Sequence, residues 1–356
     1  MNQNILPVNM PQFASYNTHA NLETIITSSN SDNISWFYNS FLQITMPKNH
    51  TLTGWSALFN IELNNNLLYN YCPLIINYNI SSKMISDKWG LITDFIIDSI
   101  DKGYYITCMM NGKYIKCYDA FEKYDFNHDI FIYGYDKLNE VFYIRDFIKN
   151  QRYTDGRASF SDIIKAYENA EVYYPDKFNG VYMLTYNEAY KWIFDMKNFI
   201  RNMELYLNSQ PLNISAHHVN LEHDIGYIDE QNFVFGMRCY DTLIKQLQYI
   251  KSENIPYIKL QTYHVLLTHK KILHDSIKYI IDTQLIYINP TENILSEFNN
   301  ILESYNIILS YIIKFNISQN VTVIDKIISL IEQTKNKEIQ NLDKIIQTYN
   351  RQSTIL

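Results

Sequence analysis

The spacing of apolar positions changes partway along the chain, from a period of about 2 residues to one of about 3.6. In the first half, short aromatic and β-branched runs alternate with turns, which predicts antiparallel strands. The strands expected are 105–109, 114–118, 130–135, 141–146, 172–174 and 181–184. In the second half, long stretches have helical spacing, and the helices expected are 187–208, 235–252, 258–283, 294–315 and 323–349. The change of period predicts a strand-rich domain 1–185 and an all-helical domain 186–356.

Ahead of these strands the pattern is less regular. Apolar residues at helical spacing predict short helices at 20–28, 89–100 and 159–169. Either Ser159 or Ser161 is suited to cap the last of these. Residues 35–46 alternate aromatic and polar positions, which is typical of a half-buried strand or an edge segment. The first domain is therefore expected to mix strands with a few short helices.

The composition is that of a globular protein, because 47% of the 356 residues are hydrophobic and 19% are charged. The net charge of −7 argues against nucleic acid as the main ligand, since phosphate binding requires a basic face. No run approaches the roughly 18–20 apolar residues that span a membrane, and no signal peptide is recognisable. Four scattered cysteines without a CxxC pair predict free thiols and a cytoplasmic location.

The chain lacks the common cofactor motifs. It has no GxGxxG, P-loop, HExxH or GxSxG sequence, so no cofactor is expected. A group of loop histidines matches no zinc spacing, so no metal is expected either; the group is His217, His218 and His223. Three lysines form either a basic patch for an acidic carrier protein or an ordinary solvated helix face, and the second is favoured. These are Lys270, Lys271 and Lys278.

A histidine and an aspartate carry the clearest chemical signal. His128 opens the strand 130–135, and Asp146 ends the next strand, 141–146. Adjacent antiparallel strands can bring these side chains within hydrogen-bond distance, and the carboxylate then fixes the imidazole tautomer and supports its positive charge. Such a pair is the base half of a Cys-His-Asp catalytic apparatus. Taken singly, each residue also fits an ordinary strand end.

A glutamine near the N-terminus extends this pattern. Gln12 lies six residues before Thr18, just ahead of the first expected helix. In papain-like thiol enzymes a glutamine at this spacing helps form the oxyanion hole, and the nucleophile lies at a helix N-terminus, where the dipole lowers a thiol pKa. The chain thus carries Gln12, Thr18, His128 and Asp146 in papain-like order.

These segments resemble the N-terminal domain of the butirosin biosynthesis protein H family. The resemblance is carried by 12–22, by the His128 strand with Gly134-Tyr135-Asp136, by the strand to Asp146 and by 161–170. The later segments 235–241 and 263–271 are similar to the helical half of related bacterial proteins. The resemblance implies an α+β, papain-like N-terminal domain with a helical appendage. It also implies transfer of an acyl group from an acyl or peptidyl carrier protein thioester to a small-molecule amine in specialised metabolism.

The resemblance implies a role for each site residue. His128 is the general base, Asp146 orients it and Gln12 donates to the oxyanion. The family's nucleophile is cysteine, whereas this chain has Thr18, and a hydroxyl is a far poorer nucleophile at neutral pH because almost none is ionised.

Three interpretations of the site follow. Thr18 is an activated nucleophile, or His128 deprotonates an amine that attacks the thioester directly, or the site is inactive and the protein binds a carrier protein or product. Peptide or amide hydrolysis is a weaker alternative, because it too needs a competent nucleophile. Thr18 also suits the N-cap of the first helix.

Overall fold

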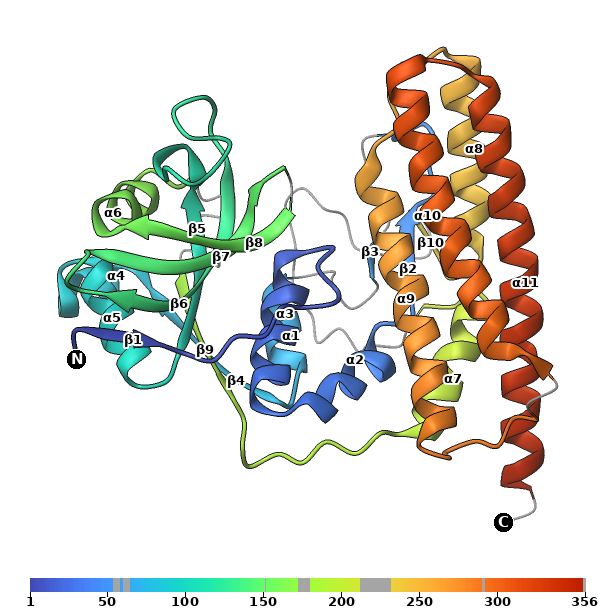
Figure 1. Cartoon of the computed structure of the whole chain (residues 1–356), viewed down its shortest axis with the longest axis horizontal. Coiled ribbons are helices and arrows are strands. Elements are labelled where there is room, and N and C mark those ends of the chain that lie inside the picture. Colours follow the sequence, from blue (N-terminus) through green and yellow to red (C-terminus); the bar gives the residue numbers. More distant parts are fainter. Residues whose placement is uncertain are drawn as a thin grey trace. The chain divides into compact units, whose positions relative to one another are not determined.

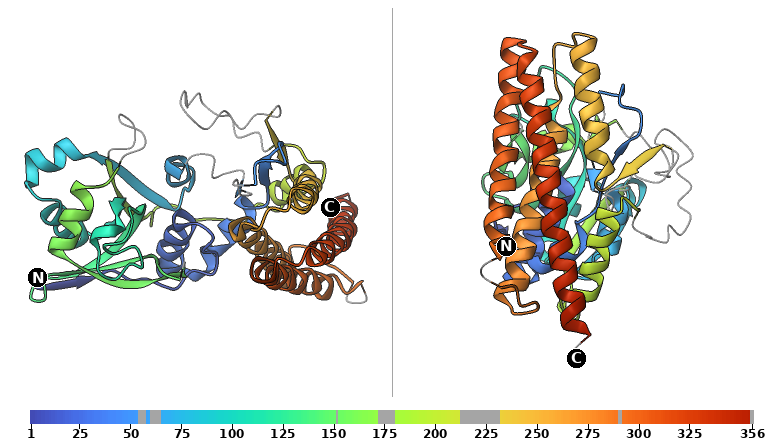
Figure 2. Two further views of the ribbon diagram at one scale, coloured as in Figure 1. Left: turned by 90° about the horizontal axis from the view of Figure 1, so that it is seen from above. Right: turned by 90° about the vertical axis from the view of Figure 1, so that its right-hand side faces the viewer.

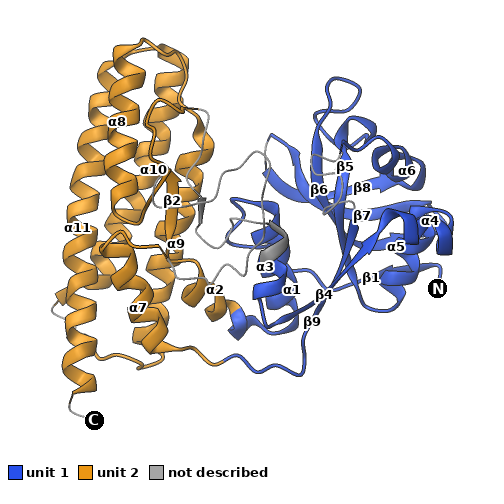
Figure 3. Ribbon diagram, turned by 180° about the vertical axis from the view of Figure 1, so that it is seen from behind, with its two compact units in different colours: residues 1–33, 66–192 blue, residues 34–65, 193–356 orange. Residues whose placement is uncertain are grey.

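The computed structural model describes residues 1–53, 58–59, 65–150, 152–171, 180–211, 232–289 and 292–354. The chain divides into two compact units, which Figure 3 colours separately. Unit 1 comprises Met1–Asn33 and Asn66–Trp192, and unit 2 comprises Ile34–Asn65 and Ile193–Leu356. The boundary expected after residue 185 lies near the actual one after Trp192. The segment 34–65, however, belongs to unit 2 and not to the first unit.

Unit 1 contains an antiparallel sheet with the order β4-β9-β5-β6-β7-β8, and β1 pairs with the last residues of β6 (Figure 1). The strands are β1 (Gln3–Ile5), β4 (Ile75–Ser81), β5 (Tyr105–Asn111), β6 (Asn127–Asp136), β7 (Val141–Lys149), β8 (Arg152–Ser159) and β9 (Gly180–Tyr186). The strand expected at 114–118 is wrong. The Asn111 side chain accepts from Lys113 N at 3.1 Å and starts the turn η3 (Gly112–Tyr114) instead.

Helices cover both faces of this sheet. The helices of unit 1 are α1 (Asn17–Ser29), α4 (Ser82–Trp89), α5 (Ile92–Asp101) and α6 (Phe160–Glu168), and α3 (Asn65–Tyr71) begins at the unit boundary. Alternate residues of β5, β6 and β7 form the main core with α5 and α6, among them Ile106, Met110, Ile130, Ile132 and Ile144. α1 lies on the other face, where Tyr153 Oη donates to Asn21 Oδ1 at 2.6 Å (Figure 1).

The first of the two expected capping serines is confirmed. Ser159 is the N-cap of α6, and its Oγ accepts from Asp162 N at 3.0 Å. Such a bond satisfies one of the backbone amides that the first helical turn leaves without a partner.

Unit 2 is mainly helical. Its helices are α2 (Ser35–Ser40), α7 (Met196–Leu207), α8 (Arg238–Ser252), α9 (Leu260–Asp282), α10 (Ile294–Ser318) and α11 (Thr322–Ser353). The long helices α9, α10 and α11 pack side by side (Figure 2). A small sheet has the order β10-β2-β3, formed by β10 (Phe233–Phe235), β2 (Ile44–Pro47) and β3 (Leu58–Phe59). No helix in the described residues is long and apolar enough to cross a membrane.

Three expectations for unit 2 are corrected. The domain 186–356, expected to be all-helical, contains the strand β10, which pairs with β2. Residues 35–46, expected as one strand or edge segment, form α2 and then β2. The alternation was misleading because Trp36, Phe37 and Tyr38 are all buried, so the segment has no single apolar face. The helix expected at 187–208 begins only at Met196.

Gly236 provides a test of the packing between β10 and α7. Its φ is +51°, and a Cβ added there would lie 2.1 Å from Tyr206 O. Gly236→Ala is therefore expected to destabilise unit 2 by about 1–3 kcal/mol through backbone strain alone, with the clash adding to this. Urea denaturation followed by far-UV circular dichroism measures the effect. Gly90→Ala is the control, because φ is +77° there but nothing lies within 4 Å. Equal losses in the two variants would contradict the expectation.

Candidate active site

His128 and Asp146 are brought together on neighbouring strands of unit 1. His128 Nδ1 lies 2.8 Å from Asp146 Oδ1 and 2.9 Å from Oδ2. The Asp146 side chain is fully buried, whereas 28% of the His128 side chain is exposed. Tyr118 Oη donates to Asp146 Oδ2 at 2.8 Å. The expected pair therefore has a buried carboxylate that is held in place and an imidazole that reaches solvent.

The sheet register explains this geometry. His128 is paired with Met110 of β5, and cross-strand partners share a face of the sheet. Asp146 follows Ile144 by two residues on β7, so its side chain lies on the same face as that of Ile144. Ile144 pairs with Ile132, which lies four residues after His128 on β6, so His128 and Asp146 share this face. Phe126 stacks on the imidazole with ring centroids 5.0 Å apart, and Phe147 meets it edge-on at 6.0 Å. Together these contacts limit the orientations open to the ring.

The charges around His128 favour its protonated form. Burial alone would lower the pKa of His128, but the charge and hydrogen bond of Asp146, with the charge of Asp129, raise that pKa above its ordinary value. Burial raises the pKa of Tyr118 well above its usual range, and Asp146 raises it further, so the phenol is a neutral donor. A proton on His128 Nδ1 satisfies Asp146 and leaves Nε2 as the basic nitrogen of the neutral ring.

Asp146→Asn is expected to lower the pKa of His128, because burial of the ring persists while the attracting charge is lost. A histidine whose pKa is raised on folding contributes stability below its unfolded pKa of about 6.5, and this contribution is lost as the pH rises through the folded pKa. Asp146→Asn should remove this contribution of His128 to the stability of the folded state. NMR titration of the His128 ring measures the shift. Asp129→Asn is the control, and it should lower the pKa of His128 by less than Asp146→Asn does. A His128 pKa unchanged by Asp146→Asn would contradict the expectation.

Thr18 is not an activated residue in this structure. The N-cap of α1 is Tyr16, which makes no side-chain capping bond, so the expected N-cap role of Thr18 is wrong. Thr18 is only 1% exposed, and its Oγ1 has no hydrogen-bond partner among the described residues. His128 is therefore not hydrogen-bonded to the Thr18 hydroxyl. A general base must reach the proton that it removes, and this geometry does not provide that contact.

Asn17 is the residue that joins the start of α1 to the histidine strand. It is the first residue of α1, and its Nδ2 donates to Asp129 O at 2.7 Å. Its Oδ1 accepts from Thr18 N at 3.0 Å. The residue beside the His128 strand is thus one position earlier than expected. Its position follows from the start of α1, which begins at Asn17, three residues earlier than in the predicted helix 20–28.

Gln12 is held through its backbone. Gln12 N donates to Glu23 Oε1 at 2.6 Å and Phe13 N donates to Oε2 at 2.8 Å. Glu23 is 1% exposed and lies in the second turn of α1, so this carboxylate fixes the loop that leads into the helix. The side chain of Gln12 is exposed. Its oxyanion role stays a prediction.

The cysteines do not supply a replacement nucleophile. All four are free thiols, and Cys72, Cys108 and Cys239 are buried. Burial raises the pKa of each buried thiol well above its ordinary value, and it raises the pKa of Cys117 to about 11. A thiolate is therefore a minor species at neutral pH at every one of these positions.

Metal-binding side chains are not gathered in the described part of the chain. No group of three or more His, Cys, Asp or Glu side chains there is placed to hold a metal ion. The loop histidines considered above, at 217, 218 and 223, lie outside the described residues.

Comparisons with known proteins do not add to this geometry. No protein-family model matches the chain, and no curated protein matches it.

Proposed function

We propose that the protein is a papain-like acyltransferase of the butirosin H type that uses His128 as a general base and forms no acyl-enzyme intermediate. The observation that supports this best is the pairing of a partly exposed imidazole with the buried Asp146 carboxylate. Asp146 orients the ring and stabilises its positive charge, which are the properties that a general base requires.

In the proposed reaction the amine acts on the thioester directly. The amine nitrogen attacks the carbonyl carbon of an acyl or peptidyl carrier protein thioester, and His128 Nε2 takes a proton from that nitrogen. The C–N bond forms, the C–S bond breaks, and the leaving carrier thiolate receives the proton from the imidazolium. The products are an amide and the free carrier thiol. Thr18 takes no part, because its hydroxyl is buried and makes no contact with a base.

The test is mass spectrometry of the full chain incubated with acyl-carrier thioesters and amine acceptors. Wild type should form the amide without an acyl adduct on the protein, and Thr18→Val should retain turnover. Valine keeps the shape of threonine, and removal of a hydroxyl without a hydrogen-bond partner leaves no other group unsatisfied. An acyl adduct on Thr18, or loss of product in a folded Thr18→Val protein, would make Thr18 the nucleophile and overturn the direct mechanism.

A second function, favoured by Asn17, is an inactive relative that binds a carrier protein or product. The amide side chain at the first position of α1 is not a nucleophile, and Asn17 is only 7% exposed. Wild type would then form no amide, yet calorimetry would detect carrier-protein binding. Turnover gained by Asn17→Cys or Thr18→Cys would show that the site has lost its nucleophile, and would identify the position that the nucleophile must occupy.

A further inference from the structure

Strand β4 ends the unit 1 sheet in the described part of the chain, and its own residues include none of the usual features that prevent pairing with another strand. In the described residues it pairs with β9 on one side and ends the strand order on the other. Edge strands are usually protected by charged side chains, proline or a bulge. β4 has the sequence Ile-Ile-Asn-Tyr-Asn-Ile-Ser, without charge or proline, and its register with β9 runs from Ile75 to Ser81 without a shift.

The hydrogen-bond pattern shows which backbone groups point away from β9. Asn187 N donates to Leu74 O at 2.8 Å, one step before the pair Ile75 and Tyr186. In an antiparallel ladder, hydrogen-bonded and non-hydrogen-bonded pairs alternate. The backbone groups of 76, 78 and 80 therefore point toward β9. Those of Asn77 and Asn79 point outward from the sheet.

The same strand is a sequence palindrome. The segment 76–80 has the sequence Ile-Asn-Tyr-Asn-Ile, identical in both directions and centred on Tyr78. A two-fold axis through Tyr78 brings like residues together, because each position i then faces position 156 − i of the other copy. Two large side chains on one face of this strand are partly exposed, since Tyr78 is 49% and Ile76 is 37% exposed, and the Tyr78 ring also meets Tyr104 edge-on with centroids 6.0 Å apart.

We propose that β4 pairs antiparallel with β4 of a second copy of this chain, with the two-fold axis at Tyr78. Asn77 then forms a hydrogen-bonded pair with Asn79 of the second copy, using the outward backbone groups. Ile76 faces Ile80 of the second copy. The two Tyr78 residues meet as a non-hydrogen-bonded pair, whose Cα atoms are about 4.5 Å apart in such ladders. Aromatic and β-branched cross-strand pairs stabilise a sheet, and the interface is isologous, as C2 symmetry requires.

This proposal does not depend on the proposed chemistry, because no residue of the candidate site is in β4. A short ladder buries less than the roughly 1,200–2,000 Å² of stable interfaces, so the dimer is expected to be concentration-dependent. Sedimentation velocity of the full chain over a concentration series should show this monomer–dimer equilibrium.

A charge exchange at Tyr78 is the decisive experiment. Tyr78→Lys and Tyr78→Asp should each weaken self-association about tenfold or more, because the axis places two like charges directly opposite each other. An equimolar mixture of the two variants should restore the dimer through opposite charges. Tyr287→Lys is the control, since Tyr287 is 72% exposed and lies in unit 2, so this variant should associate as wild type does.

A cross-linking experiment detects the dimer even if it is weak. Tyr78→Cys should form a disulfide with its own symmetry mate under mild oxidation, because the Cα separation falls within the 4.4–6.8 Å range of disulfides. Tyr287→Cys should not. A dimer that persists in Tyr78→Lys would show that another surface is used. A chain that stays monomeric at every concentration and gives no Tyr78→Cys cross-link would also overturn the proposal.

Discussion

His128→Gln is expected to lower the rate of amide formation about 10²–10⁴-fold, the usual contribution of a positioned general base. Glutamine fills similar space and can still donate to Asp146, but it cannot accept a proton at neutral pH. The affinity for the carrier protein should change little, because the substitution leaves the residues that surround position 128 unchanged. Initial rates measured by mass spectrometry over a range of thioester concentrations separate the effect on kcat from that on KM.

The pH profile distinguishes lost chemistry from lost structure. The wild-type rate should rise with pH through the pKa of His128, which Asp146 and Asp129 raise above its ordinary value despite burial. In His128→Gln this limb of the profile should disappear, even if some amine reacts unaided. His264→Gln, at an exposed position of unit 2, is the matched control and should leave the profile unchanged. A His128→Gln enzyme with the wild-type rate would exclude the general-base role.

The His–Asp pair was predictable because its cause is local. Two adjacent antiparallel strands with a short connection fix which side chains share a face, and β6 and β7 are neighbours in the sheet as expected. The start of α1 was harder, since the helix begins at Asn17 after a Tyr16 N-cap that makes no side-chain bond. Without a capping side chain, the sequence does not distinguish Asn17 from Thr18 as the residue that meets the histidine strand.

Contacts between residues that are far apart in the sequence could not be predicted either. Lys270 was expected either on a basic patch or on a solvated helix face, but it is 1% exposed and faces Glu338, which is fully buried. The two residues are 68 positions apart, on α9 and α11. Periodicity identified both helices correctly, but it does not show which polar residue finds a partner inside the bundle. A lysine near the apolar side of a helix has the same pattern whether or not a carboxylate faces it.

The environment of Lys270 is a closed polar network inside unit 2. Lys270 Nζ lies 2.6 Å from Glu338 Oε1 and also 2.6 Å from Oε2. Tyr206 Oη donates to Glu338 Oε1 at 2.8 Å, and Lys270 also donates to the hydroxyls of Tyr206 and Tyr240. The rings of Tyr206, Tyr240 and Tyr305 lie around the ammonium group. Burial lowers the pKa of Lys270, while the charge of Glu338 and its hydrogen bond act in the opposite direction.

Lys270→Met is expected to destabilise unit 2 by about 3–5 kcal/mol, because it leaves the Glu338 carboxylate buried without a counter-charge. Glu338→Leu should be comparably destabilising, since it leaves the ammonium group without its partner. The double variant should lose less stability than the sum of the singles, because no uncompensated charge remains in the core. Urea denaturation followed by helical circular dichroism at 222 nm measures each free energy of unfolding.

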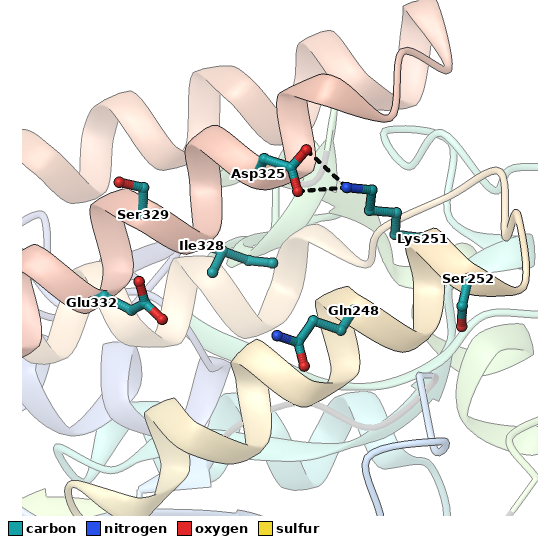
Figure 4. A pocket seen from close by; sticks show the side chains of 7 residues that line it. All are labelled: Gln248, Lys251, Ser252, Asp325, Ile328, Ser329 and Glu332. Carbon is teal, nitrogen blue, oxygen red and sulfur yellow. Dashed lines mark hydrogen bonds and ion pairs between the residues drawn. The ribbon is translucent and has the colours of Figure 1, made fainter.

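Lys251 provides a matched control in the same helical unit. It pairs with Asp325 at 2.7 Å, joining α8 to α11 beside a surface pocket (Figure 4). The side chains of this pair are 40% and 57% exposed, so water screens their attraction, and an exposed pair contributes only about 0–1 kcal/mol. Lys251→Met should therefore change the stability of unit 2 far less than Lys270→Met does. If the two variants lost the same free energy, or if the Lys270–Glu338 double variant were simply additive, burial of an unpaired charge would not be the reason that Lys270 matters.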